Sequence, residues 1–172
     1  MRQLLLITCC TLLLAGCLGM PAGMQPVQPF ELPRYLGQWY EVARLDHSFE
    51  RGLSRVSADY SLQANGQVQV VNRGYDAASG RWREAVGKAR FVASSDQGYL
   101  KVSFFGPFYG SYVIFELDQQ DYQYAFVAGP NRDYLWLLAR TPQVSPALRE
   151  RFVAVARAHG FATEQLIWVE QP

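Results

Sequence analysis

Apolar and polar residues alternate in eight consecutive runs of this chain, with turn-forming residues between them. Successive side chains of a β-strand point to opposite faces of a sheet, so this period of two predicts strands. The predicted strands cover residues 39–45, 55–62, 67–72, 83–91, 99–104, 111–117, 122–128 and 134–140. The connections are short, and Asn65-Gly66 is a strong hairpin signal. The pattern predicts an all-β fold, an eight-stranded up-and-down antiparallel β-barrel.

The two ends of this series carry a Trp and an Arg. Trp39 opens the first strand and Arg140 ends the eighth, so an up-and-down barrel places both at the same rim. A guanidinium over an indole ring gives a cation–π contact of ~0.5–2 kcal/mol. We therefore predict that Gly37, Trp39 and Arg140 form a structural latch. The turns at this rim are compact and polar, which indicates the closed end. The opposite rim, with predicted loops 46–54, 74–80, 105–110 and 129–133, is the expected mouth.

One helix is predicted after the eighth strand. Ser145 is placed to cap its N-terminus, Pro146 suits the first turn, and Gly160 suits the stop. Apolar residues at helical spacing predict that this α-helix packs on the outside of the barrel. Residues 165–169 are expected to add a short ninth strand beside the first.

The first residues have the pattern of a secretory signal. Residues 4–14 are apolar apart from two Thr, and this stretch is too short for a membrane-spanning helix. It runs into Leu14-Ala15-Gly16-Cys17, which resembles the lipobox of bacterial lipoproteins. That resemblance implies a signal peptide at residues 1–16 and lipidation of Cys17 with diacylglycerol and palmitate. A flexible tether would follow to residue 30, with the barrel domain at residues 31–172. The alternative is an ordinary secreted protein with a Cys at this position by chance.

Composition excludes several classes of function. Loss of Arg2 with the signal would leave 15 basic against 15 acidic residues, with no basic run, which argues against nucleic-acid binding. Cys9 and Cys10 would leave with the signal and Cys17 would be acylated, so no disulfide is expected in the barrel. His47 and His159 are isolated, so we predict no metal site and no cofactor.

Three motifs resemble those of the lipocalin family. Gly37-Gln38-Trp39 matches its G-x-W motif, Gln120-Asp121-Tyr122 its T-D-Y-like turn with Gln in place of Thr, and Arg140 its last motif. Residues 37–52, 101–110 and 129–142 look like the bacterial outer-membrane branch of lipocalins, relatives of apolipoprotein D. The resemblance implies a lipid-anchored binder of a fatty acid or lysophospholipid for storage, transport or scavenging at the envelope. It also implies outer-membrane delivery with the domain facing the periplasm, and homodimer formation.

Strand phase selects the residues expected to face inward. Alternation alone does not separate a hollow barrel from one whose side chains fill a solid core, but the resemblance favours a ligand cavity. The opposite phase of the eighth strand, with Leu135 and Leu137, is expected to face the helix. The predicted ligand-binding residues of the cavity are Ala58, Tyr60, Val102, Phe104, Tyr112, Ile114, Phe126, Tyr134, Trp136 and Leu138.

An aromatic segment lies in the predicted loop 105–110. Phe105, Phe108 and Tyr109 would be near solvent there, and exposed apolar clusters mark a partner, a ligand or a membrane surface. Three interpretations remain open: a ligand gate, a dimer contact, and a plug folded back into the mouth. A lipid headgroup also needs polar partners at the entrance. The candidate cations are Arg51, Arg73, Lys88, Arg90 and Lys101.

A lipid-modifying enzyme on the same scaffold is the alternative to a binding protein. No thiol is expected in the mature barrel, and His47 has no nearby elbow-like Ser, so nucleophilic catalysis is not favoured. An inward Glu41 or Glu84 would have a raised pKa and so leaves acid–base chemistry open. We expect a non-enzymatic binding protein.

Overall fold

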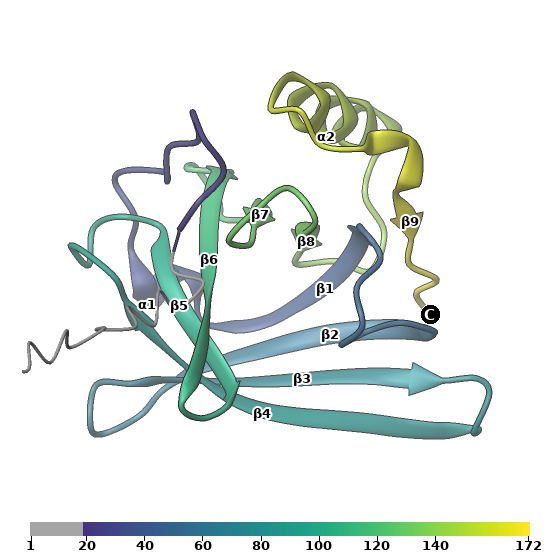
Figure 1. The fold of residues 1–172 in the computed structure, drawn as a ribbon, viewed down its shortest axis with the longest axis horizontal. Coiled ribbons are helices and arrows are strands. Elements are labelled where there is room, and N and C mark those ends of the chain that lie inside the picture. The colour runs from purple at the N-terminus through teal and green to yellow at the C-terminus, as the bar shows by residue number, and fades with distance from the viewer. Residues whose placement is uncertain (1–18) are drawn as a thin grey trace, which may run out of the picture.

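The computed structural model describes residues 19–172, which form a closed antiparallel barrel with one long helix against its wall (Figure 1). The predicted signal peptide and the predicted acylation site, Cys17, lie outside the described residues. The helices are α1 (Leu32–Tyr35), α2 (Pro146–Ala158) and the 3₁₀ turn η1 (Thr163–Gln165). The strands are β1 (Gly37–Arg44), β2 (Leu53–Leu62), β3 (Val68–Asp76), β4 (Arg81–Phe91), β5 (Tyr99–Phe105), β6 (Phe108–Leu117), β7 (Tyr124–Ala128), β8 (Leu135–Ala139) and β9 (Ile167–Trp168).

The strand order confirms the predicted up-and-down barrel. Each of β2 to β7 pairs with the next strand, β8 pairs with β1, and β1 pairs with β2 to close the sheet. The short β9 adds beside β1 through Ala43 and Arg44. The prediction of a loop at residues 74–80 is wrong in extent, because β3 and β4 continue their ladder to the pair Asp76–Arg81. The loop at 105–110 is likewise a tight hairpin, in which Phe105 pairs with Phe108.

The two faces of the sheet form two separate apolar clusters. The inner cluster lies inside the barrel and includes Trp39, Tyr60, Val70 and Val127. The outer cluster lies between the wall and α2, where Leu135 and Leu137 pack with Phe152. Leu135 and Leu137 therefore face the helix, as predicted. Adjacent residues of a strand belong to different clusters. A shift of one residue in strand register would therefore move each inward side chain to the face that contacts the helix.

The sequence around α2 sets its two ends. The Ser145 hydroxyl accepts a hydrogen bond from the Leu148 backbone N–H, and Pro146 occupies the first turn. Gly160 has φ +80°, a left-handed conformation that glycine adopts without a steric penalty, and it ends the helix. Phe152 and Ala156 are the buried residues of the helix and fasten it to the barrel.

The segment before α1 packs on the barrel, so the prediction of a flexible tether is wrong for the part that is described. Met24 is buried in the outer cluster, and the Val27 backbone bonds both Ile114 and Gly98. Phe30 enters the inner cluster next to Tyr35. Gly, Pro and Gln without charge suggested a tether, but Met24, Val27 and Phe30 supply the apolar anchors.

The C-terminal residues complete the wall where β1 and β2 separate. The β1–β2 ladder ends at the pair Tyr40–Ser57, although both strands continue toward the other rim. The Gln171 side-chain amide donates to the Glu41 and Val56 carbonyls at 2.6 and 2.9 Å, one on each strand. This seam is thus bridged by the Gln171 side chain together with backbone bonds from the Val169 N–H to the Val42 carbonyl and from the Arg55 N–H to the Glu170 carbonyl.

Candidate functional site

The closed end of the barrel is occupied by the predicted latch. Trp39 is fully buried, and the Arg140 guanidinium lies 3.9 Å from the centre of its ring system. Arg140 also donates to the backbone carbonyls of Arg34 and Gln38, each at 2.8 Å. Gly37 has φ +89°, a conformation that glycine adopts without strain, and it lies against the same guanidinium. The latch therefore joins β1, β8 and α1 at one end of the sheet.

Three tyrosines form a polar group inside the barrel, above the latch. The Tyr112 hydroxyl shares hydrogen bonds of 2.7 Å with the Tyr35 hydroxyl and 2.9 Å with the Tyr60 hydroxyl. Tyr35 also stacks beside Trp39, with ring centres 4.6 Å apart. Burial raises the pKa of Tyr112, so its hydroxyl keeps its proton at neutral pH. The three hydroxyls satisfy one another at the inner end of the barrel.

The middle of the interior has one wall of small side chains. Register places Gly87 of β4 opposite Val70 of β3, and Ala89 opposite Val68, on the inner face. A Cβ built on Gly87 would lie 2.7 Å from the Phe104 ring, so the absent side chain makes room for that ring. Several inward residues stay only partly buried although they belong to the inner cluster, among them Ala58, Val102, Phe104, Tyr112 and Trp136. The interior at this level is therefore accessible rather than filled solid.

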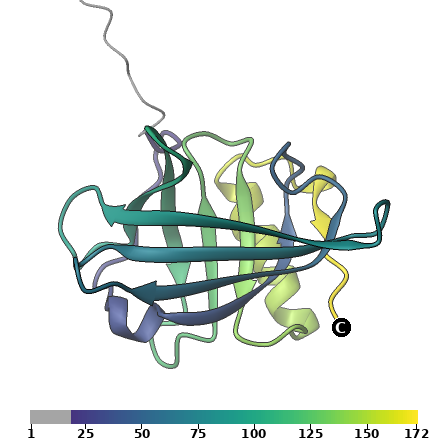
Figure 2. The ribbon, with the colours of Figure 1, turned by 90° about the horizontal axis from the view of Figure 1, so that it is seen from below.

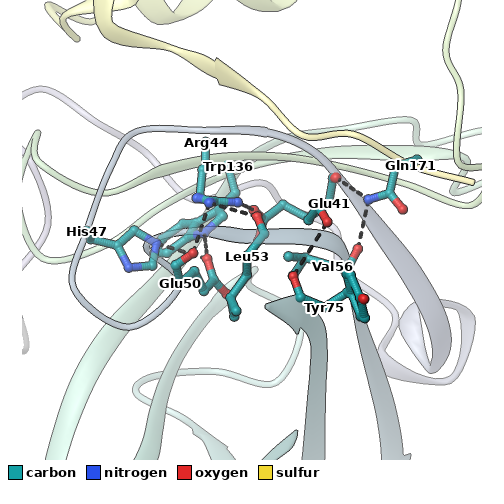
Figure 3. Close-up of polar contacts among 10 residues, drawn as sticks. Glu41, Arg44, His47, Glu50, Leu53, Val56, Tyr75, Trp136 and Gln171 are labelled. Carbon is teal, nitrogen blue, oxygen red and sulfur yellow. Dashed lines mark hydrogen bonds and ion pairs between the residues drawn. The ribbon is translucent and has the colours of Figure 1, made fainter. Parts of the chain in front are cut away.

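A buried charged group lies near the other rim, toward the mouth (Figure 3). Arg44 is almost fully buried and points into the barrel from the end of β1. One guanidinium nitrogen donates to Glu41 Oε1 at 2.7 Å, and the other donates to the Glu50 and Leu53 carbonyls at 2.9 and 3.2 Å. Its Nε is buried without a hydrogen-bond partner. Arg44 thus holds the loop between β1 and β2 over the barrel opening and retains one unused donor.

Glu50 connects this group to the aromatic side chains of the mouth. Its carboxylate accepts from the Trp136 indole N–H at 3.1 Å and lies 3.0 Å from His47 Nε2. The His47 ring lies 5.2 Å from Trp136 and 5.7 Å from Tyr134. His47 Nδ1 is buried without a partner. Glu41, Arg44, His47, Glu50 and Trp136 are called the mouth cluster below.

The two carboxyl groups of the mouth cluster have opposite pKa shifts. Burial raises the pKa of Glu41, the nearby Glu50 raises it further, and Arg44 opposes both. Burial alone would also raise the pKa of Glu50, but the contact with His47 outweighs it and the pKa falls below its usual value. Groups with strongly shifted pKa values in a partly enclosed site are functional candidates.

Most of the predicted cavity residues lie on the inner face. The residues that belong to the inner cluster are Ala58, Tyr60, Val102, Phe104, Tyr112, Ile114, Trp136 and Leu138. Tyr134 lies at the mouth and stacks beside Trp136 at 6.2 Å. The prediction for Phe126 is wrong: it packs against Phe152 of α2, with ring centres 4.9 Å apart. Tyr122 has φ +54°, which breaks the alternation before β7 and turns Ala125 and Val127 inward instead.

The cations proposed for a headgroup lie away from the interior. Arg51 pairs with Asp46 and Arg73 with Glu84, both on exposed surface. Sequence analysis missed Arg44 because it follows an apolar stretch in β1. A β-bulge between Glu41 and Ala43 changes the strand's phase and directs Arg44 inward. The signal that was present is a charged residue within a run that is otherwise apolar.

The aromatic segment between β5 and β6 remains on the surface. Phe105 and Phe108 are 70% and 74% exposed at the hairpin tip, so the plug interpretation is wrong. Tyr109 is half-buried, with Lys88 and Lys101 ammonium groups 5.9 and 5.3 Å from its ring centre. Among residues 19–172 no group of His, Cys, Asp and Glu has a metal-binding arrangement. No helix in that part of the chain has the length and apolar character to cross a bilayer.

Comparison with known proteins gives consistent matches over the whole barrel. Residues 30–171 match the model of the Lipocalin-like domain. The chain is 59% identical to the outer membrane lipoprotein Blc of Vibrio cholerae over 171 residues, 99% of each chain. It is 49% identical to outer membrane lipoprotein Blc of Escherichia coli K12 over 152 residues, 88% of this chain and 85% of the relative. Among solved structures, the cockroach allergen Per a 4 superposes with a TM-score of 0.69 at 19% identity, covering 90% of this chain and 96% of that one.

Proposed function

Since this chain belongs to the lipocalin family, we propose that it holds one fatty acid or lysophospholipid inside the barrel at the cell envelope. The acyl chain would lie along the partly buried inner face, and the polar end would lie at the mouth cluster. Storage, transport and scavenging of lipids all require this reversible occupancy. Two relatives carry the name outer membrane lipoprotein, which supports anchorage of this chain to the outer membrane through an acylated Cys17, with the barrel on the periplasmic side.

The observation that carries this proposal is the division of the interior into an apolar middle and a charged mouth. Partly buried apolar side chains line the middle, and charged side chains are gathered at the mouth. Transfer of an acyl chain from water into such surroundings gains ~0.8 kcal/mol per CH₂ group. A long chain therefore contributes on the order of ten kcal/mol before the costs of ordering and association.

The mouth cluster has the chemistry to receive an anionic headgroup. Arg44 supplies a positive charge and an unused Nε–H donor inside the barrel. Burial raises the pKa of Glu41, so Glu41 can hold a proton when a phosphate or carboxylate approaches. The ligand's negative charge would then replace that of Glu41 as the partner of Arg44, and no unpaired negative charge would remain buried.

A titration of the delipidated protein tests the proposal. We expect saturable binding of oleate and of lysophosphatidylethanolamine, with a change in Trp136 fluorescence because its indole borders the interior. The signal should vanish in Trp136→Phe and persist in the control Trp168→Phe, whose side chain is on the outside of the barrel. Absence of saturation for both lipids would overturn the proposal.

One observation favours a second candidate function, a lipid-modifying enzyme. The raised pKa of Glu41 suits a general acid or base, whereas Glu84 is exposed and paired with Arg73. Incubation of the protein with lysophospholipid, followed by mass analysis of the lipid, decides between the two. A product formed by the natural protein and not by Glu41→Gln would establish the enzyme. An unchanged lipid recovered from a saturated protein would support the binding protein.

A further inference from the structure

We propose that the mouth of the barrel rests on the phospholipid leaflet that carries the anchor, with the β5–β6 hairpin inserted among the lipid headgroups. This inference extends the proposed function, and it rests on acylation of Cys17. The proposed function states that the barrel binds a lipid and is anchored, but it does not say which end of the barrel faces the membrane. Three independent features of the mouth support it.

The first feature is the place where the described chain begins. A Cβ built on Gly19 would lie 4.0 Å from the Pro130 carbonyl oxygen, in the loop between β7 and β8. Arg132 of the same loop donates to the Ala22 carbonyl at 2.9 Å. In an up-and-down barrel this loop shares the mouth rim with the β1–β2, β3–β4 and β5–β6 connections. Figure 2 shows the purple start of the described chain and α1 at opposite ends of the barrel.

The anchor is therefore close to the mouth. Cys17 precedes Gly19 by two residues, and a chain spans at most ~3.3–3.6 Å per residue, so covalent geometry keeps the two within about 7 Å. Acyl chains on Cys17 would enter the leaflet beside the β7–β8 loop. A tether this short permits the mouth to face the membrane and holds the closed end, a barrel length away, in the aqueous phase.

The second feature is the distribution of exposed aromatic residues. Among residues 19–172, four Phe or Trp side chains are more than half exposed, and all lie on or beside mouth connections. They come from the β1–β2, β3–β4 and β5–β6 connections. They are Phe49 (67%), Trp82 (59%), Phe105 (70%) and Phe108 (74%). At the closed end, by contrast, Phe30, Tyr35 and Tyr122 are buried. Aromatic side chains gathered at one end match the preference of such residues for the headgroup region.

The third feature is the charge behind the hairpin tip. The ammonium groups of Lys88 and Lys101 lie 5.9 and 5.3 Å from the centre of the Tyr109 ring, and neither forms an ion pair with any residue from 19 to 172. If Phe105 and Phe108 enter the leaflet, these two ammonium groups reach the level of the phosphates. Long cationic side chains extend toward lipid phosphates while their stems stay against apolar surface. A second protein copy would have to bury those two charges instead.

This orientation would give a lipid a dry route into the barrel. A lysophospholipid that leaves a bilayer for water loses on the order of ten kcal/mol of apolar transfer free energy, which slows its release. With the mouth on the leaflet, the acyl chain passes between the aromatic residues without full exposure to water. The acyl chain enters the barrel first, and the headgroup then binds at the mouth cluster.

Spin labels on the full, acylated protein test the orientation. Phe105→Cys and Phe108→Cys are each labelled with a nitroxide and reconstituted in phosphatidylethanolamine–phosphatidylglycerol vesicles. The control is Leu62→Cys, at the closed rim, where the side chain is 52% exposed. We expect the first two labels to be accessible to oxygen and shielded from a water-soluble nickel chelate, and the Leu62 label to show the reverse. Labels at 105 and 108 that are open to the chelate would overturn the proposal. So would short label-to-label distances that persist when the vesicles are diluted with lipid, because these would assign the hairpin to a second copy.

A transfer assay separates this inference from the proposed function. In Phe105→Ser/Phe108→Ser we expect transfer of a fluorescent lysophospholipid out of vesicles to slow by about tenfold or more, since each lost Phe removes more than about 1.4 kcal/mol of membrane interaction. Affinity for the same lipid as a monomer in solution should match that of the natural protein and of Leu62→Ser. If the natural protein does not bind the monomeric lipid in solution, the proposed function is refuted, whatever the orientation of the barrel. Unchanged transfer with intact solution affinity would refute the orientation alone.

Discussion

The two ends of the barrel use similar residues for opposite purposes. At the closed end the indole of Trp39 is covered by Arg140, its N–H donates to the Tyr35 carbonyl at 2.7 Å, and the guanidinium donors find backbone carbonyls. At the mouth, Trp136 and Arg44 belong to a cluster in which Arg44 Nε and His47 Nδ1 are buried without a hydrogen-bond partner. Buried polar groups are normally satisfied, so unsatisfied ones call for a functional explanation. The closed end has its polar groups paired and stabilises the fold, and under the proposed function the unpaired groups of the mouth receive the ligand.

The largest effect should come from removing the closed-end indole. We expect Trp39→Ala to lower the free energy of unfolding by about 3–5 kcal/mol, because a buried Trp leaves a cavity and Arg140 loses its ring. Urea denaturation followed by circular dichroism measures it. Trp168→Ala, at an exposed ring, is the matched control and should cost much less. Equal losses in the two variants would contradict a special role for the closed end.

A smaller and more selective effect is expected at Arg44. Arg44→Leu alone should destabilise the protein by about 3 kcal/mol, since it leaves Glu41 buried without its partner. Arg44→Leu/Glu41→Leu should recover most of that stability and still fail to bind an anionic lipid. Isothermal titration with oleate, alongside denaturation, separates the two properties. A double variant that is stable and binds oleate normally would show that the mouth cluster has no part in binding.

The smallest effect is a pH dependence at Glu41. Its pKa is raised in the folded state above the ordinary value of 4.5, so its contribution to stability is greatest below that pH and falls as pH rises through the folded pKa. Glu41→Gln does not titrate, and its stability relative to the natural protein should therefore increase between pH 5 and pH 8. Glu50, whose pKa is lowered, acts only at more acidic pH and leaves this window undisturbed. A relative stability independent of pH would mean that Glu41 is ionised throughout.

The closed end followed from the sequence much more completely than the mouth did. Alternation gave the strands, and Gly37, Trp39 and Arg140 lie together because regular strands place them at one rim. Regular alternation fails at two points, the first at the mouth and the second at the closed end. A bulge in β1 directs Arg44 inward, and the left-handed Tyr122 reverses the phase that was assigned to Phe126. Bulges and left-handed residues depend on tertiary contacts, so a count of alternating residues does not detect them.

The described N-terminal segment shows the same limit in another form. Its composition predicted a tether, yet Met24, Val27 and Phe30 reach the barrel individually. Three apolar residues without periodicity carry no strand or helix signal, although each gains stability by burial against a surface formed elsewhere in the chain. Under the proposed acylation of Cys17, the position of this segment places the anchor near the mouth.

The bridge made by Gln171 makes completion of the wall depend on a residue that lies far along the chain from the two strands it joins. Its side-chain amide joins the carbonyl of Glu41 in β1 to the carbonyl of Val56 in β2, and both residues precede Gln171 by more than a hundred positions in the chain. A chain that emerges N-terminus first, whether from a ribosome or from a translocation pore, leaves this seam without its side-chain bridge until Gln171 has emerged. In Gln171→Ala the Glu41 and Val56 carbonyls would lose this bridge, and the seam would keep only the backbone bonds that Val169 and Glu170 make to Val42 and Arg55.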